Sequence, residues 1–364
     1  MIVAQLVASS GQTGVETHLI ALTRALARAG VRPILCCPEE GPLTETLRAG
    51  GFEVRLVAPH GRVRPAGLLH LADALKDIDL VHAHGPRGIF WSALVRALRP
   101  GRPALATVHE LELTGAASAV RRAVYRPVER WSLARHDLLI AVSHDLARRL
   151  VGRAGIAPSR VHVVPNSSAL LLAPRPALGP LPPPCAIVAA RLEPVKGVDL
   201  LIEAWAKLRD AGRAFPLRVL GEGAARADLE ALVRARGLGD LVRFEGFVRD
   251  PAPLLARASM YVAPSRMEGL PGSVIEAMAL GVPVVATRVG GNVDVLEGAA
   301  PEWLVPPEDP AALADAASRL AALPAEESLA LRARLQDESY RRFHPDVVAA
   351  QVIALYDGLA RRAA

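Results

Sequence analysis

Short apolar segments alternate with helix-like segments along most of the chain, and this alternation constrains the fold more than any other feature of the sequence. The apolar segments of the first half lie at residues 2–8, 32–37, 53–57, 80–83, 104–108 and 138–142. Helical patterns such as VETHLIALTRALARAG fill most of the gaps between them. Continuous apolar runs of this length are typical of parallel strands that helices cover on both faces. The pattern therefore predicts an α/β protein with a doubly wound parallel sheet.

A second series of apolar segments follows in the other half of the chain, at residues 185–190, 217–221, 242–246, 260–264 and 283–287. The stretch APRPALGPLPPP, residues 173–184, separates the two series, and its proline content predicts a semi-rigid linker. We expect two Rossmann-like domains, an N-terminal one in residues 1–172 and a C-terminal one in residues 185–344. Residues 345–364 contain a further helical pattern.

The composition is typical of a large soluble enzyme. With 364 residues, the chain is long enough for two or three domains. Hydrophobic residues make up 51% of it and charged residues 22%, which excludes a disordered chain. No apolar run reaches the ~18 residues of a membrane span, and the start, MIVAQLVASSGQTG, lacks the basic leader of a signal peptide. Cys36, Cys37 and Cys185 have no metal-binding spacing, so a reduced, cytoplasmic setting is expected.

The formal net charge of +6 raises the question of nucleic-acid binding. Aromatic residues make up 4% of the chain, too few for base-stacking surfaces, and no nucleic-acid motif is present, so we predict no nucleic-acid partner. Residues 119–137, AVRRAVYRPVERWSLARHD, interleave arginines with Val124, Tyr125 and Trp131, as a helix at a membrane surface does. This segment is either a site of peripheral contact with the inner membrane face or a surface helix with a buried stripe.

The run PSRMEGLPGSVIEAMALGVPVVATRVGG, residues 264–291, contains two carboxylates that bracket seven residues. Glu268 begins the sequence EGLP, and Glu276 lies one turn inside the helix-like pattern that follows. A helix start offers unpaired N–H groups to an anion, and carboxylates accept hydrogen bonds from hydroxyl groups. Two solvated charges beside an ordinary helix are the plain alternative, but Glu276 stands among apolar neighbours, where an unpartnered carboxylate is costly. The pair predicts a site for a phosphorylated, sugar-like ligand.

This run resembles the EGLPxxxxEAMAxGxPV motif of the retaining glycosyltransferases of family 4, the glycosyl transferases group 1, which have the GT-B fold. The resemblance extends over nearly the whole chain. It implies two Rossmann-like domains that face a cleft, with an acceptor-binding N-terminal domain, a nucleotide-sugar-binding C-terminal domain and a final helix that crosses back to the N-terminal domain. It also implies that Glu268 holds hydroxyl groups of the donor sugar, assisted by the backbone of Gly269, Leu270 and Pro271. Glu276 would accept hydrogen bonds from the ribose.

Two cations follow the first strand of the second series, in the sequence RLEPVKG, residues 191–197. Ligands of open α/β sheets bind beyond the carboxyl ends of the strands, so Arg191 and Lys196 are placed to meet a diphosphate. Arginine grips a phosphate through two N–H groups and lysine through a point charge. The resemblance implies the same role, because the matching residues of family 4 bind the donor phosphates. Gly221, in the GEG sequence after the next strand, resembles the glycine turn of the family's donor site.

In the N-terminal half, SSGQTGVE, residues 9–16, follows the first strand and opens a helix, where Gly14 lets the backbone approach a phosphate. The family commonly has paired glycines there, whereas this chain has a threonine before Gly14. His109 ends a predicted strand and resembles the histidine that relatives place near the donor sugar; a hydrogen-bonded histidine at a strand end is the plain alternative. VPNSS, residues 164–168, departs from the PNG-[VI]-D pattern of the family.

Two other patterns raise the question of a metal site. His82 and His84 share one face of a predicted strand, but no third ligand is evident, and we expect them to line the cleft or contact the acceptor. Asp77 and Asp79 match the D-x-D triplet of metal-dependent transferases of the GT-A type, yet they directly precede a predicted strand, poorly placed to hold a metal beside a nucleotide. We therefore predict no metal site and no cofactor.

These observations predict a metal-independent glycosyltransferase that moves a sugar from a nucleoside diphosphate, UDP before GDP, to an acceptor hydroxyl with retention of the anomeric configuration. The acceptor would be a glycan, a lipid-linked molecule or a small molecule. The resemblance implies that no protein nucleophile is needed, because the departing diphosphate helps to take the acceptor proton. The alternatives are an epimerase and a protein of the same fold that binds nucleotide sugars without transfer; the intact set Arg191, Lys196, Glu268 and Glu276 argues against the binding protein. The candidate catalytic residues are His109, Arg191, Lys196 and Glu268.

Overall fold

The computed structural model describes residues 1–10, 14–57, 65–111 and 119–363. The chain divides into two compact units: unit 1 comprises Met1–Leu172 and His344–Ala364, and unit 2 comprises Ala173–Phe343. The predicted linker, residues 173–184, opens unit 2. Among the described residues, no helix is both long enough and apolar enough to cross a membrane.

Unit 1 is built on a seven-stranded parallel sheet with the order β3-β2-β1-β4-β5-β6-β7. Its strands are β1 (Ile2–Val7), β2 (Arg32–Cys37), β3 (Val54–Leu56), β4 (Leu80–His84), β5 (Ala104–Val108), β6 (Leu138–Ala141) and β7 (Val161–Val163). The strand order reverses beside β1, which pairs with both β2 and β4. At this reversal, Val7 lies opposite His84, so the carboxyl ends of β1 and β4 are level. Open α/β sheets bind their ligands at such a point.

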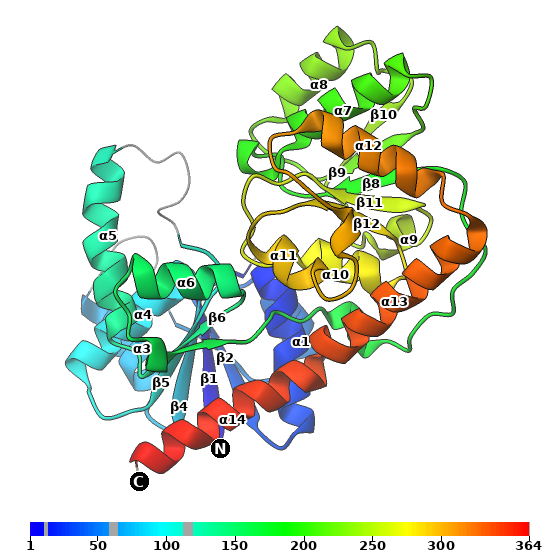
Figure 1. Ribbon diagram of the computed structural model, residues 1–364. Coiled ribbons are helices and arrows are strands. Elements are labelled where there is room, and N and C mark those ends of the chain that lie inside the picture. Colours follow the sequence, from blue (N-terminus) through cyan, green and yellow to red (C-terminus); the bar gives the residue numbers. More distant parts are fainter. Residues whose placement is uncertain (11–13, 58–64, 112–118, 364) are drawn as a thin grey trace. The chain divides into compact units, whose positions relative to one another are not determined.

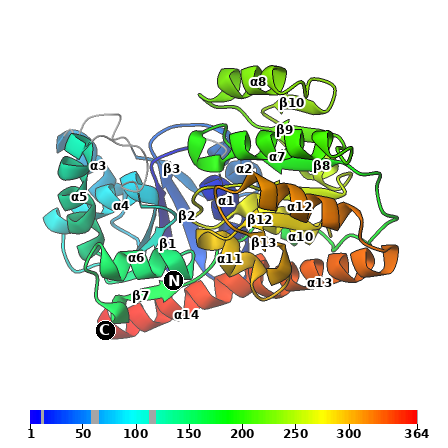
Figure 2. The same cartoon turned by 45° about the horizontal axis from the view of Figure 1, so that its top comes forward.

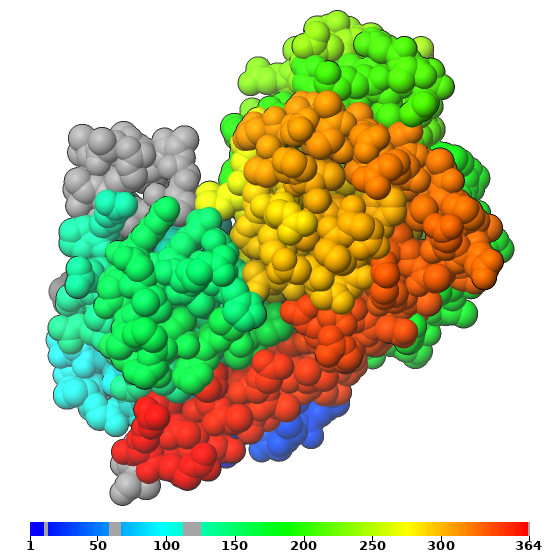
Figure 3. All heavy atoms as spheres, in the orientation of Figure 1, coloured from blue at the N-terminus to red at the C-terminus, as the bar shows by residue number. Residues whose placement is uncertain are grey.

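The helices of unit 1 cover both faces of this sheet (Figure 1). They are α1 (Gly14–Arg28), α2 (Pro42–Ala49), α3 (Pro65–Ala74), α4 (Gly85–Leu98), α5 (Ala119–Ala134), α6 (His144–Gly152) and α14 (Pro345–Ala363), with short 3-10 turns η2 (Pro158–Arg160) and η3 (Ala169–Leu172). The inner face of α14 buries Val352 and Tyr356 in one apolar cluster with Val3 of β1 and Leu22 of α1. Its outer face is open to solvent at the red end of the colour scale in Figure 3. The C-terminal helical pattern therefore completes the core of unit 1.

Unit 2 has a six-stranded parallel sheet with the order β10-β9-β8-β11-β12-β13. Its strands are β8 (Ala186–Ala189), β9 (Leu217–Leu220), β10 (Val242–Gly246), β11 (Met260–Ala263), β12 (Val284–Thr287) and β13 (Leu304–Val305). The order reverses between β8 and β11. β7 and β13 have no counterpart among the predicted segments, because β7 has a histidine at its centre and β13 has two residues.

The helices of unit 2 also pack on both faces of its sheet. They are α7 (Val198–Asp210), α8 (Arg226–Ala235), α9 (Ala252–Leu255), α10 (Gly272–Ala279), α11 (Gly290–Leu296), α12 (Pro310–Ala321) and α13 (Ala325–Phe343), with 3-10 turns η4 (Pro194–Lys196) and η5 (Pro301–Trp303). α7 and α12 lie side by side on one face (Figure 2), and α10 packs against α13. Trp205 of α7 is fully buried and donates its indole N–H to Phe215 O at 2.8 Å. The predicted α/β architecture with two doubly wound parallel sheets is confirmed.

Candidate functional site

Two loops of unit 2 meet where its strand order reverses. One leaves β8 and carries Arg191 and Lys196, and the other leaves β11 and carries Glu268. The strands are hydrogen-bonded neighbours, so the two loops start side by side. Gly197, at the end of η4, has a φ of 66°, and a Cβ there would lie 2.1 Å from Pro264 O. A glycine is required because the backbones of the two loops are in contact.

Lys196 and Glu268 form the centre of this site. Lys196 Nζ donates to both carboxylate oxygens of Glu268, at 2.8 and 2.9 Å. Ser265 Oγ donates to Glu268 Oε1 at 2.7 Å. The Lys196 side chain is 20% exposed and that of Glu268 10%. An ammonium group has three N–H donors, so Lys196 keeps one for a further acceptor. The pair places a cation and a hydrogen-bond acceptor side by side, which suits a ligand with both phosphate oxygens and hydroxyl groups.

The loop that carries Glu268 is held by residues that no sequence motif indicates. Thr287 Oγ1 donates to Ser265 O at 2.5 Å, and Asn292 Nδ2 donates to Thr287 O at 3.0 Å. A Cβ on Gly290 would lie 2.0 Å from Glu268 O, and one on Gly291 would lie 2.3 Å from Gly269 O. Two adjacent glycines that follow a strand are a sequence signal that could have indicated this close approach of the backbones.

Gly269, Leu270 and Pro271 connect Glu268 to α10. Pro271 is buried, and α10 begins immediately after it. Glu276, one turn inside α10, is half-buried, whereas its neighbours Ile275 and Ala277 belong to the core. The apolar surroundings of Glu276 in the sequence therefore belong to the inner face of α10, and its carboxylate lies at the margin of that face.

Arg191 and Gly221 are the other predicted site residues of unit 2. The Arg191 side chain is 56% exposed and donates to Glu193 Oε1 at 2.8 Å, so it is directed to solvent. Gly221 has a φ of 128°, and a Cβ there would lie 1.9 Å from Ala190 O. The packing of the loop after β8 thus explains Gly221 without a ligand.

Unit 1 gathers four buried imidazoles near the carboxyl ends of β4 and β5: His18, His82, His84 and His109. The ring centroids of His82 and His84 are 4.1 Å apart, and those of His84 and His109 are 5.8 Å apart. Burial lowers the pKa of His109 to about 4 and, together with the nearby His109, that of His18 to about 3. It also lowers the pKa of His82 and His84 well below the ordinary range. These imidazoles are therefore neutral at pH 7.

His109 directly follows β5 and is 7% exposed. No described group forms a hydrogen bond of ordinary geometry with either of its ring nitrogens, and Asn166 Oδ1 is also without a partner. The charge of Glu16 and, after it, the side chain of Asn166 oppose the effect of burial on the pKa of His109. The role that the resemblance implies for His109 stays a prediction.

The sequence predicts that His82 and His84 line the cleft or contact the acceptor, and for His82 this is wrong. His82 is 0% exposed, and its Nδ1 and Nε2 are each 2.7 Å from a hydroxyl, that of Tyr356 and that of Thr107. His84 Nε2 lies 2.7 Å from Gln5 Oε1, and Gln5 Nε2 donates to Tyr356 OH at 3.1 Å. Because α14 brings Tyr356 against β4, His82 belongs to the core of unit 1.

The remaining predictions in unit 1 concern Gly14 and the D-x-D triplet. Gly14 is the exposed first residue of α1, and residues 11–13 before it lie outside the described part of the chain. Both carboxylate oxygens of Asp77 accept from Arg55, at 2.6 and 2.7 Å, and Asp79 Oδ2 accepts from Ile2 N at 2.7 Å. The described residues contain no group of three or more His, Cys, Asp and Glu that could hold a metal ion. The triplet thus stabilises the turn before β4.

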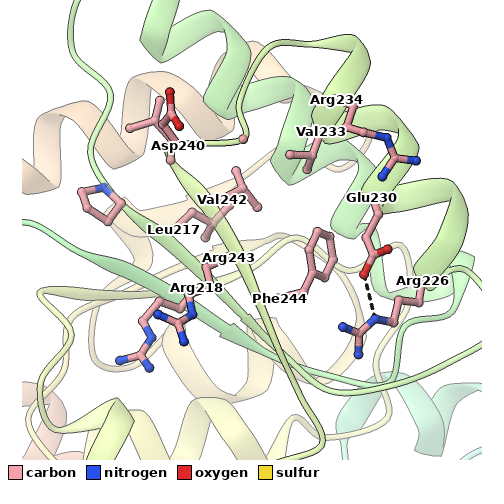
Figure 4. Close-up of a pocket in the computed structure, with 13 residues that line it drawn as sticks. Leu217, Arg218, Arg226, Glu230, Val233, Arg234, Asp240, Val242, Arg243 and Phe244 are labelled. Atoms are coloured by element: carbon pink, nitrogen blue, oxygen red, sulfur yellow. Dashed lines mark hydrogen bonds and ion pairs between the residues drawn. The ribbon is translucent and has the colours of Figure 1, made fainter.

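A depression of about 620 Å³ lies elsewhere in unit 2, between α8 and the edge strand β10 (Figure 4). It includes Pro216, Leu217 and Leu241, at the amino ends of β9 and β10. Arg226 on its rim donates to Glu230 at 2.9 Å. The depression lies away from the reversal between β8 and β11, the point at which open α/β sheets bind their ligands.

Both halves of the chain match known protein families. Residues 12–167 match the family model described as Glycosyltransferase Family 4, and residues 183–322 match the model described as Glycosyl transferases group 1. The phosphatidyl-myo-inositol mannosyltransferase of Mycobacterium leprae is 31% identical over 371 residues, which cover 95% of this chain and 93% of that protein. The chain belongs to glycosyltransferase family 4. The 2-deoxystreptamine glucosyltransferase of Streptomyces kanamyceticus is also similar to this glycosyltransferase, 30% identical over 357 residues that cover 87% of this chain and 92% of that protein.

Solved structures show the same fold. The structure of Anabaena HepE in complex with UDP matches with a TM-score of 0.81 at 20% identity, covering 98% of this chain and 100% of that one. The sucrose-phosphate synthase of Thermosynechococcus elongatus matches with a TM-score of 0.78 at 23% identity, covering 98% of each chain. The GT-B fold of this glycosyltransferase is thereby confirmed.

The basic segment 119–137 forms α5 and the turn after it. Tyr125 and Val128 are exposed, by 44% and 40%, while Trp131 packs against Phe90 of α4 with ring centroids 6.2 Å apart. The side chains of residues 119–124 lie outside the described part of the chain. α5 thus buries part of one side and exposes an aromatic and an aliphatic residue on another.

Proposed function

We propose that this glycosyltransferase moves a sugar from a UDP-sugar to an acceptor hydroxyl with retention of the anomeric configuration. The observation that carries the proposal is the Lys196–Glu268–Ser265 group at the strand reversal of unit 2. A protonated amine beside a carboxylate matches a donor whose diphosphate is next to a polyhydroxylated ring.

In this proposal, the residues of unit 2 bind different parts of the donor. Lys196 and Arg191 stabilise negative charge on the diphosphate as the sugar leaves. Glu268 accepts hydrogen bonds from donor sugar hydroxyls, together with the backbone of the Gly269–Pro271 segment. Glu276, half-buried in α10, accepts hydrogen bonds from the ribose. Since Arg191 now pairs with Glu193, it would have to exchange this carboxylate for the diphosphate.

Unit 1 provides the acceptor side and two further contacts to the donor in this proposal. The acceptor oxygen attacks the anomeric carbon on the face from which the diphosphate departs, and the acceptor proton passes to a departing phosphate oxygen. His109 is buried and neutral, so it contacts the reacting sugar as a hydrogen-bonding group without charge. Gly14, at the start of α1, lets the backbone approach the donor.

UDP is our first choice of nucleotide. HepE, which has the same fold, was crystallised with UDP and with UDP-glucose, and these complexes support UDP over GDP without fixing the sugar. A panel of UDP-glucose, UDP-N-acetylglucosamine and GDP-mannose in thermal unfolding tests the choice, because a ligand at 100 times its Kd stabilises by about 2.7 kcal/mol. We expect at least one UDP-sugar to stabilise the protein and to be hydrolysed slowly without acceptor. Stabilisation without hydrolysis or transfer would instead indicate a binding protein.

We propose that the reaction needs neither a cofactor nor a divalent metal. Lys196 and Arg191 supply positive charge for the diphosphate, and Asp77 and Asp79 are already engaged by Arg55 and by the β1 backbone. Activity should therefore survive excess EDTA with less than a two-fold change. Loss of activity on chelation and its recovery with manganese would contradict this part of the proposal.

Peripheral membrane contact through residues 119–137 is part of the proposal if the acceptor is lipid-linked. The exposed Tyr125 and Val128 support it, since an amphipathic helix inserts such residues at the interface. Sedimentation with vesicles that contain anionic lipid should carry down the parent more than a Tyr125→Ser, Val128→Ser variant. Equal sedimentation of both would leave α5 a plain surface helix.

A further inference from the structure

Arg266 lies between the two loops of the proposed donor site and contacts both of them. It belongs to the loop after β11, two residues before Glu268. Its backbone N–H donates to Val195 O at 2.8 Å, next to Lys196 on the other loop. Its guanidinium Nη1 donates to Pro194 O at 2.6 Å. Arg266 therefore links the segments that carry the two charged residues of the site.

The guanidinium also forms ion pairs with two carboxylates from different elements. Nη1 and Nη2 donate to the two oxygens of Asp199, in the first turn of α7, both at 2.8 Å. Nε donates to Glu308 Oε1 at 2.6 Å, and Nη2 reaches Glu308 Oε2 at 3.3 Å. Counting Pro194 O, all five N–H donors of the guanidinium have an acceptor. Arg266 is thus fully engaged by protein groups and has no N–H left for a substrate phosphate.

Glu308, the second carboxylate partner of Arg266, has an unfavourable backbone conformation. Among the described residues, it is the one non-glycine residue with a positive φ, 58°. The next residue, Asp309, caps α12 by accepting from Ala311 N and Ala312 N. A left-handed conformation is unfavourable for a residue with a Cβ and persists where surrounding contacts hold it. The pair with Arg266 is such a contact, so Arg266 also fixes the start of α12.

Burial alone raises the pKa of Asp199, but the hydrogen bonds and charge of Arg266 lower it below its ordinary value. Asp199 is therefore ionised at neutral pH, and the ion pair with Arg266 is complete. The Arg266 side chain is 29% exposed and that of Asp199 41%, so the pair is partly shielded from solvent.

We infer that Arg266 is a positioning residue of the donor site, which holds the loop of Glu268 against the loop of Lys196 through Pro194, Asp199 and Glu308. This inference rests on the proposed function, since it assigns Arg266 to the reaction. A displacement of about 1 Å in a reacting group costs up to about 100-fold in rate, so the effect of losing Arg266 falls on kcat.

The test compares Arg266→Met with a matched control. Arg236→Met removes another two-point ion pair of unit 2, in which Arg236 donates to Glu203 Oε1 at 3.0 and 2.8 Å, away from both loops. We expect kcat to fall roughly 10- to 100-fold in Arg266→Met, with the donor KM changed less than about three-fold. Arg266→Lys should recover part of the loss because it keeps a charge opposite Asp199. The Arg236→Met variant should keep the parent's kcat.

Hydrogen exchange tests the same inference without any activity. Peptides that cover residues 194–199 and 264–271 should exchange at least about ten-fold faster in Arg266→Met than in the parent, and at the parent's rate in Arg236→Met. Unchanged exchange of these peptides would overturn the positioning role, and so would faster exchange with an unchanged kcat. An inactive parent would contradict the proposed function, whereas the exchange data still decide whether Arg266 holds the loops. If Arg266→Met does not fold, Asp199→Asn replaces it, with a smaller loss of kcat expected and an unchanged kcat overturning the role.

Discussion

The two units of this glycosyltransferase differ in the polar groups at their strand reversals: those of unit 2 are charged, and those of unit 1 are neutral. Unit 2 places paired charges there, with Lys196 bound to Glu268 and Arg266 bound to Asp199. Unit 1 places neutral imidazoles there, because burial lowers the pKa of His84 and His109. All ten histidines of the chain lie in unit 1, and unit 2 has none.

This difference agrees with the proposed division of the reaction. A diphosphate needs cations that stay protonated at every physiological pH, which lysine and arginine provide. The hydroxyl groups of the sugar and of the acceptor are uncharged, so they require no charged partner, and a neutral imidazole offers one donor and one acceptor. Changes in unit 2 should therefore affect catalysis and nucleotide binding, and a change of pH should affect unit 1.

The largest effect is expected for Lys196→Gln. Glutamine keeps a hydrogen-bonding side chain but removes the positive charge that would stabilise the leaving diphosphate, and loss of such a contact costs about 100- to 1000-fold in kcat. Initial rates at saturating donor measure the effect. Lys207→Gln, on the exposed side of α7, is the matched control and should retain the parent's rate. A kcat within a few-fold of the parent in Lys196→Gln would remove Lys196 from the donor site.

A smaller effect is expected for Glu276→Gln. The change removes charge-assisted hydrogen bonds to the ribose, each worth about 1.5 to 3 kcal/mol, and so weakens nucleotide binding by roughly 10- to 150-fold. Calorimetric titration of UDP and GDP against both forms measures it. The fold should be retained, because Glu276 is half-buried and its apolar neighbours form the inner face of α10. Equal affinity for each nucleotide that binds the parent would exclude Glu276 from the site.

Mild acid should destabilise unit 1 more than unit 2. Burial holds the pKa of His109 and of His136 at about 4 in the folded protein, below the ordinary 6.5. Their contribution to stability is complete above pH 6.5 and is lost as the pH falls towards 4, since the unfolded chain takes up the proton first. At pH 5 each histidine removes on the order of 2 kcal/mol.

Hydrogen exchange at pH 7 and pH 5, corrected for intrinsic rates, measures this difference. Protection in the peptides of unit 1 should decrease at pH 5, and protection in unit 2 should change little because unit 2 contains no histidine. An equal decrease in both units would show that the imidazoles do not determine the response to acid.

Most of the fold could be predicted from the sequence, because parallel strands buried on both faces leave continuous apolar runs such as that of β1 and β6. The exceptions have a physical cause. A histidine interrupts the three residues of β7, and β13 has two residues, so neither leaves an apolar run. The core position of His82 depends on Tyr356, which is 274 residues away in the chain. A local sequence pattern cannot indicate a contact between residues that are so far apart in the chain.

In the site of unit 2, the residues that belong to sequence motifs could be predicted. The EGLP and RLEPVKG sequences identified Glu268 and Lys196, which the structure brings within hydrogen-bond distance. Ser265, Thr287 and Arg266 were not identified, since they act through other protein groups and carry no chemistry of their own that a spacing reveals. The structure shows the hydrogen bond from Ser265 to Glu268, which the sequence does not indicate.

The anomeric configuration of the product distinguishes retention from inversion. With an α-linked UDP-sugar as donor, we expect an α-linked product, because the acceptor attacks the face from which the diphosphate leaves. Proton NMR of the product reports the anomeric coupling, which is small for α and large for β in gluco-configured sugars. A β-linked product would contradict the front-face mechanism and would make His109 the candidate general base, with Lys196 and Glu268 reduced to holding the donor.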